Sequence, residues 1–141
     1  MKRSTLKPLA TALSATLWFA ASPALAALPA MQHQGEVQFL TGGVGQDEAG
    51  SMRAAQPKFP LALEFVRKAT PRDEYLADVE VTVLDHGGRS VLDAQADGPF
   101  LLARLPAGEY TVKATHAGRT LDRKVRVTDH ASARAVFVWA G

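Results

Sequence analysis

The stretch that decides the fold is Asp97-Gly98-Pro99-Phe100-Leu101-Leu102-Ala103-Arg104-Leu105-Pro106-Ala107-Gly108-Glu109-Tyr110-Thr111-Val112-Lys113-Ala114. It holds two turn signals, Asp97-Gly98-Pro99 and Pro106-Ala107-Gly108, and it ends in strict alternation of apolar and polar residues. We expect the first signal to form a hairpin. Pro106 should preset φ for a tight turn, and Gly108 should supply left-handed or close-approach geometry after it. The Tyr110 ring should be buried while its hydroxyl reaches an upstream carbonyl.

Alternation with a period of two extends outward from this stretch in both directions. Val79, Val81 and Val83 alternate with polar residues, and so do the apolar positions between Phe59 and Phe65 and between Leu121 and Val127. The final run, residues 133–139, is apolar at nearly every position, which predicts a strand covered on both faces. Turn signals recur every eight to twelve residues or so. The sequence therefore predicts an all-β fold, a seven-stranded antiparallel sandwich over residues 59–141.

The preceding residues, 27–58, have a different composition and are expected to form an arm that packs on the sandwich. Residues 35–40 predict a short strand that can add to a sheet edge, within the chain or between chains. The glycines from Gly42 to Gly45 predict a flexible loop. A short helix should follow, with Asp47 and Glu48 in its first turn and its end near Ala55. Because those acids occupy the place where an anion would bind, a phosphate-binding loop is disfavoured.

The motif Asp-Gly-x-Phe at Asp97 to Phe100, followed by Leu-Pro-x-Gly-x-Tyr-x-Val at Leu105 to Val112, resembles the carboxypeptidase regulatory-like domain. The resemblance covers about residues 61–139 and implies a prealbumin-like (transthyretin-like) sandwich. The whole chain looks like small periplasmic proteins of proteobacteria that carry this domain. On this resemblance Asp97, Gly98, Pro99, Leu105, Pro106, Gly108 and Tyr110 are structural residues. A fold name of this kind implies no activity.

The first 26 residues predict a secretory signal peptide. Lys2, Arg3 and Lys7 form a positive segment, an apolar run follows, and small residues precede the cleavage site expected near Ala26. The apolar run is shorter than the ~20 residues that span a bilayer, so the mature form is not expected to span a membrane. Together with the Ala- and Arg-rich, Ile-free composition, which suggests a GC-rich bacterial gene, this predicts a periplasmic or secreted bacterial protein.

Charge and composition narrow the function classes. The whole chain has 16 basic and 14 acidic residues and a pI of about 9.2, but loss of the three basic residues in the signal peptide leaves a nearly neutral protein. Nucleic acid is therefore not an expected partner. The chain has no Cys, so its stability must come from apolar burial and not from disulfides.

Enzymatic activity is not expected, and neither is a cofactor. The chain has no His-x-x-Glu pair of a zinc carboxypeptidase and no Gly-x-Ser-x-Gly nucleophile motif. It also ends in Val138-Trp139-Ala140-Gly141, whereas the transthyretin-related hydrolases end in Tyr-Arg-Gly-Ser. A small transthyretin-like hydrolase is kept as an alternative, which would require two of His86, His116 and His130 and an Arg in one cleft.

A metal-binding envelope protein is the second alternative. If the strands run alternately up and down, the dipeptides Asp85-His86 and Asp129-His130 lie at the same end of the sandwich as Pro106, where imidazole and carboxylate groups can ligate zinc or copper. Solvated loop residues are the simpler interpretation. The opposite end should gather a mixed-charge cluster that includes Arg72, Asp73, Glu74, Asp97, His116 and Arg119. The leading hypothesis is a non-enzymatic binding module that engages another protein or an envelope component.

Overall fold

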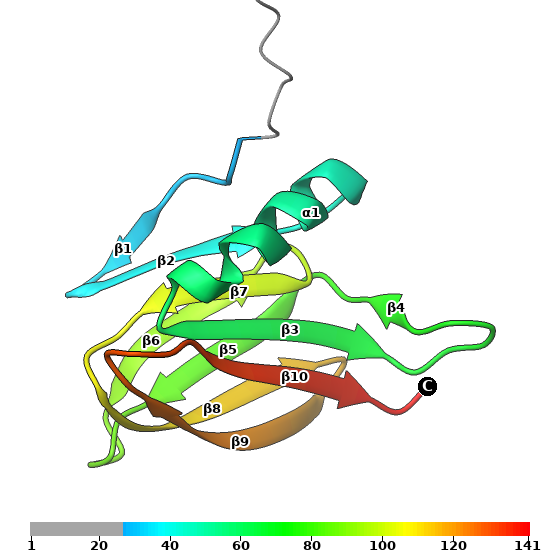
Figure 1. The fold of residues 1–141 in the computed structure, drawn as a ribbon. Coiled ribbons are helices and arrows are strands. Elements are labelled where there is room, and N and C mark those ends of the chain that lie inside the picture. The colour runs from blue at the N-terminus through cyan, green and yellow to red at the C-terminus, as the bar shows by residue number, and fades with distance from the viewer. Residues whose placement is uncertain (1–26) are drawn as a thin grey trace, which may run out of the picture.

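The computed structural model describes residues 27–141 (Figure 1), so the predicted signal peptide and its cleavage site near Ala26 lie outside the described residues. The described part has ten strands, one α-helix and one 3₁₀ turn. In chain order these are β1 (Gln32–Gln34), β2 (Val37–Gly42), α1 (Gln46–Ala55), the 3₁₀ turn (Gln56–Lys58), β3 (Leu61–Arg67), β4 (Glu74–Tyr75), β5 (Val79–Leu84), β6 (Ser90–Ala96), β7 (Phe100–Arg104), β8 (Gly108–His116), β9 (Arg119–Val127) and β10 (Ala133–Trp139).

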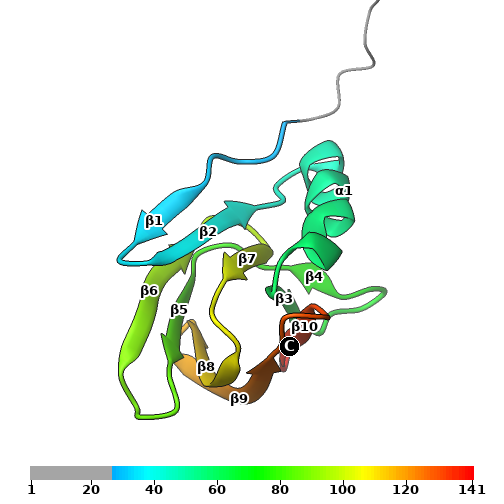
Figure 2. The ribbon, with the colours of Figure 1, turned by 60° about the vertical axis from the view of Figure 1, so that its left-hand side comes forward.

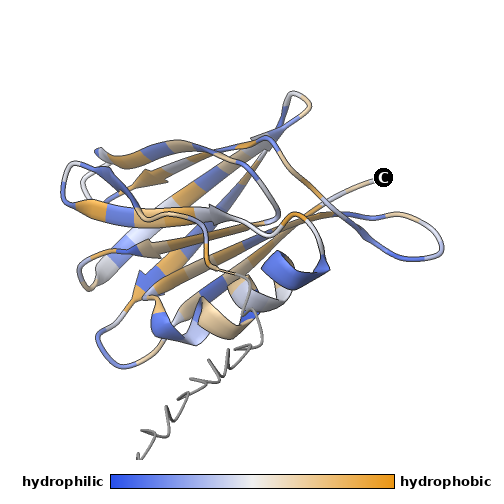
Figure 3. Cartoon of the chain, turned by 90° about the horizontal axis from the view of Figure 1, so that it is seen from above, coloured by the Kyte–Doolittle hydropathy of each residue, from blue (hydrophilic) through white to orange (hydrophobic). Residues whose placement is uncertain are grey.

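The strands form two sheets that pack face to face. The first sheet has the order β1-β2-β7-β3-β10, with the two residues of β4 pairing to the end of β3. The second sheet has the order β6-β5-β8-β9. The side chains that alternate inward from both sheets make one core, which explains the alternating hydropathy along the strands in Figure 3. The all-β expectation and the two-sheet architecture are confirmed.

The strand count and the pairing differ from the expectation. Seven of the ten strands, β3 and β5 to β10, fall where the sequence alternation places strands in the sandwich. β2 corresponds to the short strand predicted in the arm, whereas β1 and β4 are additional. All the pairs within residues 27–141 are antiparallel except one: β10 runs parallel to β3, with Leu61 opposite Ala133. The prediction of a purely antiparallel sheet is therefore wrong, because alternation along a strand carries no information about the direction of its neighbour.

The arm is an integral part of the first sheet. β2 pairs antiparallel with β7, and Val37 and Phe39 enter the core between the sheets. On the other face of the first sheet, α1 packs its buried Ala49, Met52 and Ala55 against a second apolar cluster that includes Leu40, Ala62, Phe100 and Leu102 (Figure 1). The molecule thus has three layers, and the predicted addition of the arm strand to a sheet edge occurs within the chain.

The strand that is covered on both faces is β7, beneath the helix, and not β10 at the C-terminal end. Every residue from Phe100 to Ala103 is fully buried, because α1 covers one face of β7 and the second sheet covers the other. In β10 the burial alternates, and Val136 and Val138 are 41% and 37% exposed. The expectation that residues 133–139 are covered on both faces is wrong, since the helix does not extend over β10 (Figure 1).

The two turn motifs of the deciding stretch connect the sheets. Asp97-Gly98-Pro99 joins β6 in the second sheet to β7 in the first, so it is not a hairpin. Pro106-Ala107-Gly108 leads from β7 back to β8 in the second sheet. The buried Tyr110 donates its hydroxyl proton to the carbonyl of Pro106 at 2.7 Å, as the sequence predicts. Gly108 has no positive φ, and a Cβ there would make ordinary contact with the Tyr110 ring, so no special glycine geometry is needed.

Side chains close both long seams between the sheets. On the side of β1 and β2 (Figure 2), the amide of Gln34 donates to the carbonyl of Asp93 in β6 at 2.8 Å and accepts from its N–H at 2.5 Å. On the opposite side, Arg123 of β9 donates to the carbonyl of Val136 at 3.1 Å. Trp139 donates to the carbonyl of Arg119, also at 3.1 Å. These bonds occupy backbone groups that edge strands otherwise leave free to pair with other chains.

Candidate functional site

The loop residues that the sequence singled out for a metal lie at one end of the sandwich but do not form a ligand cluster. Asp85 follows β5 and its carboxylate accepts hydrogen bonds from the N–H groups of Gly87 and Arg89, both at 2.9 Å. This is an Asx-type turn in which the carboxylate holds its own loop. Within residues 27–141 no group of three or more His, Asp or Glu side chains is placed to hold a metal ion.

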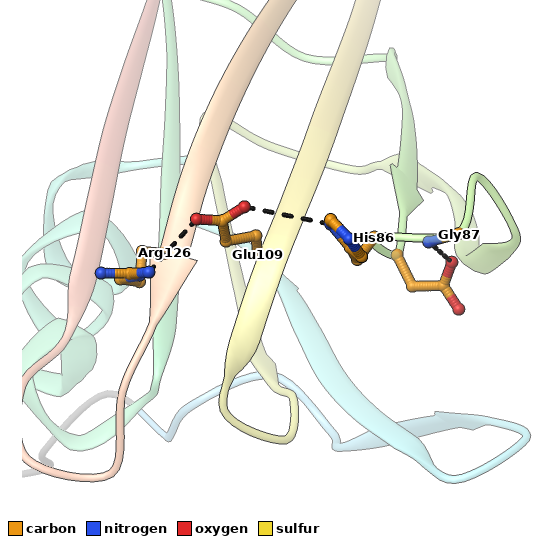
Figure 4. Close-up of polar contacts among 5 residues, drawn as sticks. His86, Gly87, Glu109 and Arg126 are labelled. Carbon is orange, nitrogen blue, oxygen red and sulfur yellow. Dashed lines mark hydrogen bonds and ion pairs between the residues drawn. The ribbon is translucent and has the colours of Figure 1, made fainter.

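The neighbours of Asp85 form an exposed polar row across the second sheet (Figure 4). Glu109 lies between His86, at 3.9 Å, and Arg126, at 3.2 Å. His86 lines a shallow depression with Glu109, and His130 lines different ones beside Arg104 and Arg126. Ion pairs this exposed are screened by water and contribute little.

The opposite end carries the predicted mixed-charge residues, but they make local contacts. Glu74 pairs with Arg67 across the β3–β4 pair. The carboxylate of Asp73 accepts from the N–H of Ala69 at 3.4 Å, and the ring of His116 packs edge-on against Trp139. His86 and His130 line different depressions, and none of those depressions includes His116, so they do not provide the arrangement that the hydrolase alternative required.

A mainly apolar hollow lies elsewhere, between α1, the glycine loop and β4. It is an open groove of about 670 Å³. Its lining residues come from three separate segments of the chain: Gly43, Val44, Gly45, Gln46, Ala49 and Arg53 from the loop and helix, Tyr75, Leu76 and Ala77 from β4 and the residues after it, and Pro99 from the connection between the sheets. Volumes of 300–1,000 Å³ with mainly apolar walls are typical of small-molecule sites.

The glycine loop forms one wall of the groove by close packing. The N–H of the buried Gly43 donates to the Glu48 carboxylate at 2.8 Å, and φ of Gly43 is +102°. A Cβ on Gly43 would lie 2.4 Å from the Phe100 ring. Gly43 thus permits close approach to Phe100, a role that the sequence did not suggest, and Val44 beside it is 66% exposed at the rim.

Arg53 and Tyr75 form the polar end of the groove. The guanidinium lies 5.3 Å from the centre of the Tyr75 ring and 5.6 Å from that of Phe100, and it donates a hydrogen bond to the Tyr75 hydroxyl. Tyr75 itself packs on Phe100, with ring centres 5.9 Å apart, and is still 49% exposed. A cation held over two aromatic rings is positioned by them.

Sequence reasoning missed the groove. The helix was predicted, so a spacing of four between Ala49 and Arg53 placed both on one face. What the sequence did not show is that Tyr75 pairs with Val66 at the end of β3, which turns the aromatic ring toward the helix. An exposed tyrosine beside a turn was the available signal.

Comparisons with known proteins identify no relative. A scan against protein-family models finds no match, and a search of curated proteins finds no significant one. Within residues 27–141 no helix is long and apolar enough to cross a membrane.

Proposed function

We propose that this protein is a non-enzymatic, exported binding module, with a prealbumin-like sandwich as the scaffold and the groove beside α1 as its binding surface. The motif from Asp97 to Val112 and the predicted signal peptide support the carboxypeptidase regulatory-like fold and the periplasmic location. The observation that carries the proposal is the groove itself, a mainly apolar hollow with one polar end formed by Arg53 and Tyr75.

The binding surface proposed here differs from the loops and free strand edges that the sequence suggested. β2 lies between β1 and β7, so the arm strand is already paired on both sides. The side chains of Gln34 and Arg123 occupy backbone acceptors along the seams. Among residues 27–141, no cluster of three or more His, Asp or Glu side chains favours the metal-binding alternative, and the histidines of the hydrolase alternative line different depressions.

The test is a nuclear magnetic resonance screen of the purified ¹⁵N-labelled protein with small apolar and amphiphilic compounds. Binding compounds should shift the backbone amides of Gly43, Gly45, Ala49 and Tyr75. Val44→Glu should abolish those shifts by placing a charge at the rim of the groove. Val136→Glu is the matched control, because Val136 is also an exposed valine but lies outside the groove.

Two results would contradict the proposal. Shifts confined to residues outside the groove would refute the binding surface. Conversion of a bound compound to product during the titration, visible in the same spectra, would refute the non-enzymatic assignment.

A further inference from the structure

The groove contains a single charged side chain. Among its lining residues Arg53 is basic and none is acidic, while Val44, Ala49, Leu76, Ala77 and Pro99 are apolar. The charge of the groove therefore complements an anion, and its walls complement an apolar body.

None of the acids that adjoin lining residues in the sequence forms an ion pair with Arg53 within residues 27–141; these acids are Asp47, Glu48, Glu74 and Asp78. Glu48 accepts from the N–H of Gly43, and Glu74 pairs with Arg67. The ion pairs within residues 27–141 involve Arg67, His86 and Arg126, and none involves Arg53. The Arg53 guanidinium is thus a cation held in place without a carboxylate partner in the described part of the chain.

The hydrogen-bonding groups of Arg53 and Tyr75 match a carboxylate. A guanidinium carries five N–H donors, and the hydrogen bond to Tyr75 uses one of them. The Tyr75 hydroxyl accepts that bond, so its own proton remains available to donate. Two adjacent donor groups suit the two oxygens of a carboxylate, and hydrogen bonds to a charged group are about twice as strong as neutral ones.

We propose that the groove binds a small organic carboxylate with an apolar body. The carboxylate accepts hydrogen bonds from Arg53 and Tyr75, and the apolar body lies against Val44, Leu76 and Ala77. This inference rests on the groove being the binding surface, as proposed above, and it adds the chemical class of the ligand.

The test compares two probes with the same apolar body, phenylbutyrate and phenylbutanol. Titrations followed at the amides of Gly43, Ala49 and Tyr75 should give about tenfold tighter binding of the carboxylate, which corresponds to ~1.4 kcal/mol. Arg53→Gln should remove this preference. Tyr75→Phe, which retains the ring and loses the hydroxyl, should reduce it.

Arg104→Gln is the matched control for the charge. Arg104 also lies over an aromatic ring, 4.6 Å from the centre of Phe59, but it does not line the groove. This variant should keep the preference for phenylbutyrate. Loss of the preference in Arg104→Gln as well as in Arg53→Gln would show a general charge effect and overturn the inference.

The outcomes separate this inference from the proposed function. Equal affinity of both probes at the groove would overturn the carboxylate class and leave the groove as the binding surface. Absence of shifts at the groove amides with both probes would overturn the inference and the proposed function together.

Discussion

Tyr110 joins β8 to the turn that precedes this strand through a single hydrogen bond. Its ring is buried, and its hydroxyl donates to the carbonyl of Pro106 at 2.7 Å. Burial, with a smaller contribution from the negative charge of Asp85, raises the pKa of the Tyr110 phenol above its ordinary value of 10.0. The neutral phenol is therefore the form that the folded protein prefers.

This pKa shift predicts a loss of stability at alkaline pH. The folded state keeps the phenolic proton at a pH where the unfolded chain has lost it, so the free energy of unfolding falls as pH rises. The contribution is fully present below pH 10.0 and is lost as pH rises through the raised pKa. Tyr110→Phe should cost about 1 kcal/mol at pH 8 through the lost hydrogen bond.

Urea unfolding at pH 8 and above pH 10 measures both effects. The difference in free energy of unfolding between the wild type and Tyr110→Phe should shrink as pH rises. Lysine titration affects both proteins equally, so it cancels in this difference. Tyr75→Phe is the control, since Tyr75 is half exposed. A difference that stays constant across this pH range would show that the phenol does not contribute as described.

Gly98 is required by the close approach of two backbone segments. A Cβ at this position would lie 2.4 Å from the carbonyl oxygen of Gly42 and 2.5 Å from its carbon. We expect Gly98→Ala to lower the free energy of unfolding by roughly 1–3 kcal/mol, as overpacking does, because backbone has to move. Thermal or urea unfolding gives the measurement.

Gly50, unlike Gly98, is a glycine at which a side chain can be added without a clash. It lies inside α1, and a Cβ there would have no atom within 4 Å. Gly50→Ala should stabilise the protein by about 0.5–1 kcal/mol through helix propensity. If both alanine variants changed stability in the same direction, the close-approach explanation for Gly98 would be wrong.

Tyr110 and Gly98 show which contacts can be predicted from local sequence and which cannot. The Tyr110 bond spans four residues, so a turn motif and a following aromatic were enough to predict it. The contact of Gly98 with Gly42 joins segments 56 positions apart, as does the neighbouring bond from the Asp97 N–H to Thr41. Asp97-Gly98-Pro99 looked like a hairpin because its residue types fit any tight turn, whichever sheets it connects.

At the scale of elements, Gln34 protects the edge of β6. Its side-chain amide makes both hydrogen bonds that a neighbouring strand would make with Asp93. Gln34→Ala should therefore cost about 1 kcal/mol and leave an open strand edge, which promotes association between chains. Urea unfolding measures the loss of stability, and light scattering over a concentration series measures the association between chains.

Gln32→Ala is the matched control for this prediction. Gln32 lies two residues earlier in β1, and its replacement leaves both contacts of Gln34 with Asp93 in place. Equal association of the two variants would argue against edge protection by Gln34.

The elements could be predicted where one local signal sufficed. α1 spans Gln46 to Ala55 with Asp47 and Glu48 in its first turn, as the sequence predicted from the preference of acidic residues for the N-terminal turn of a helix. The expectation that residues 133–139 are covered on both faces was wrong, and the burial of β7 on both faces was not predicted. The reason is that an apolar residue on an outer face is compatible with either burial or exposure. Only the position of the helix over the sheet decides which strand is covered.

At the scale of the whole molecule, the arm cannot be separated from the sandwich. β2 contributes to both apolar clusters, α1 contributes to the second, and Met52 of α1 is fully buried. Deleting residues 27–58 should abolish cooperative thermal unfolding and near-ultraviolet circular dichroism. Deleting residues 27–30 alone, which lie outside β1 and are largely exposed, should preserve both. A cooperative transition in the longer deletion would show that the sandwich is independent of the arm.

The candidate site belongs to this scale as well, which explains why the sequence did not show it. Loops at the ends of a sandwich are the usual sites of recognition, and that general rule directed attention to the histidines. The groove exists only because α1 lies across the first sheet and β4 pairs with the end of β3. Its residues come from positions 43 to 99, and no motif connects them.

The parallel pairing of β3 with β10 also sets how the chain reaches its native state. Leu61 is opposite Ala133, and Phe39 of β2 is opposite Ala103, so the first sheet is assembled from partners far apart in sequence. The entropy of closing such large loops has to be overcome before the strand contacts form. Refolding after stopped-flow dilution from urea should accordingly take milliseconds to seconds, and the chain should remain a substrate for proteases during that interval.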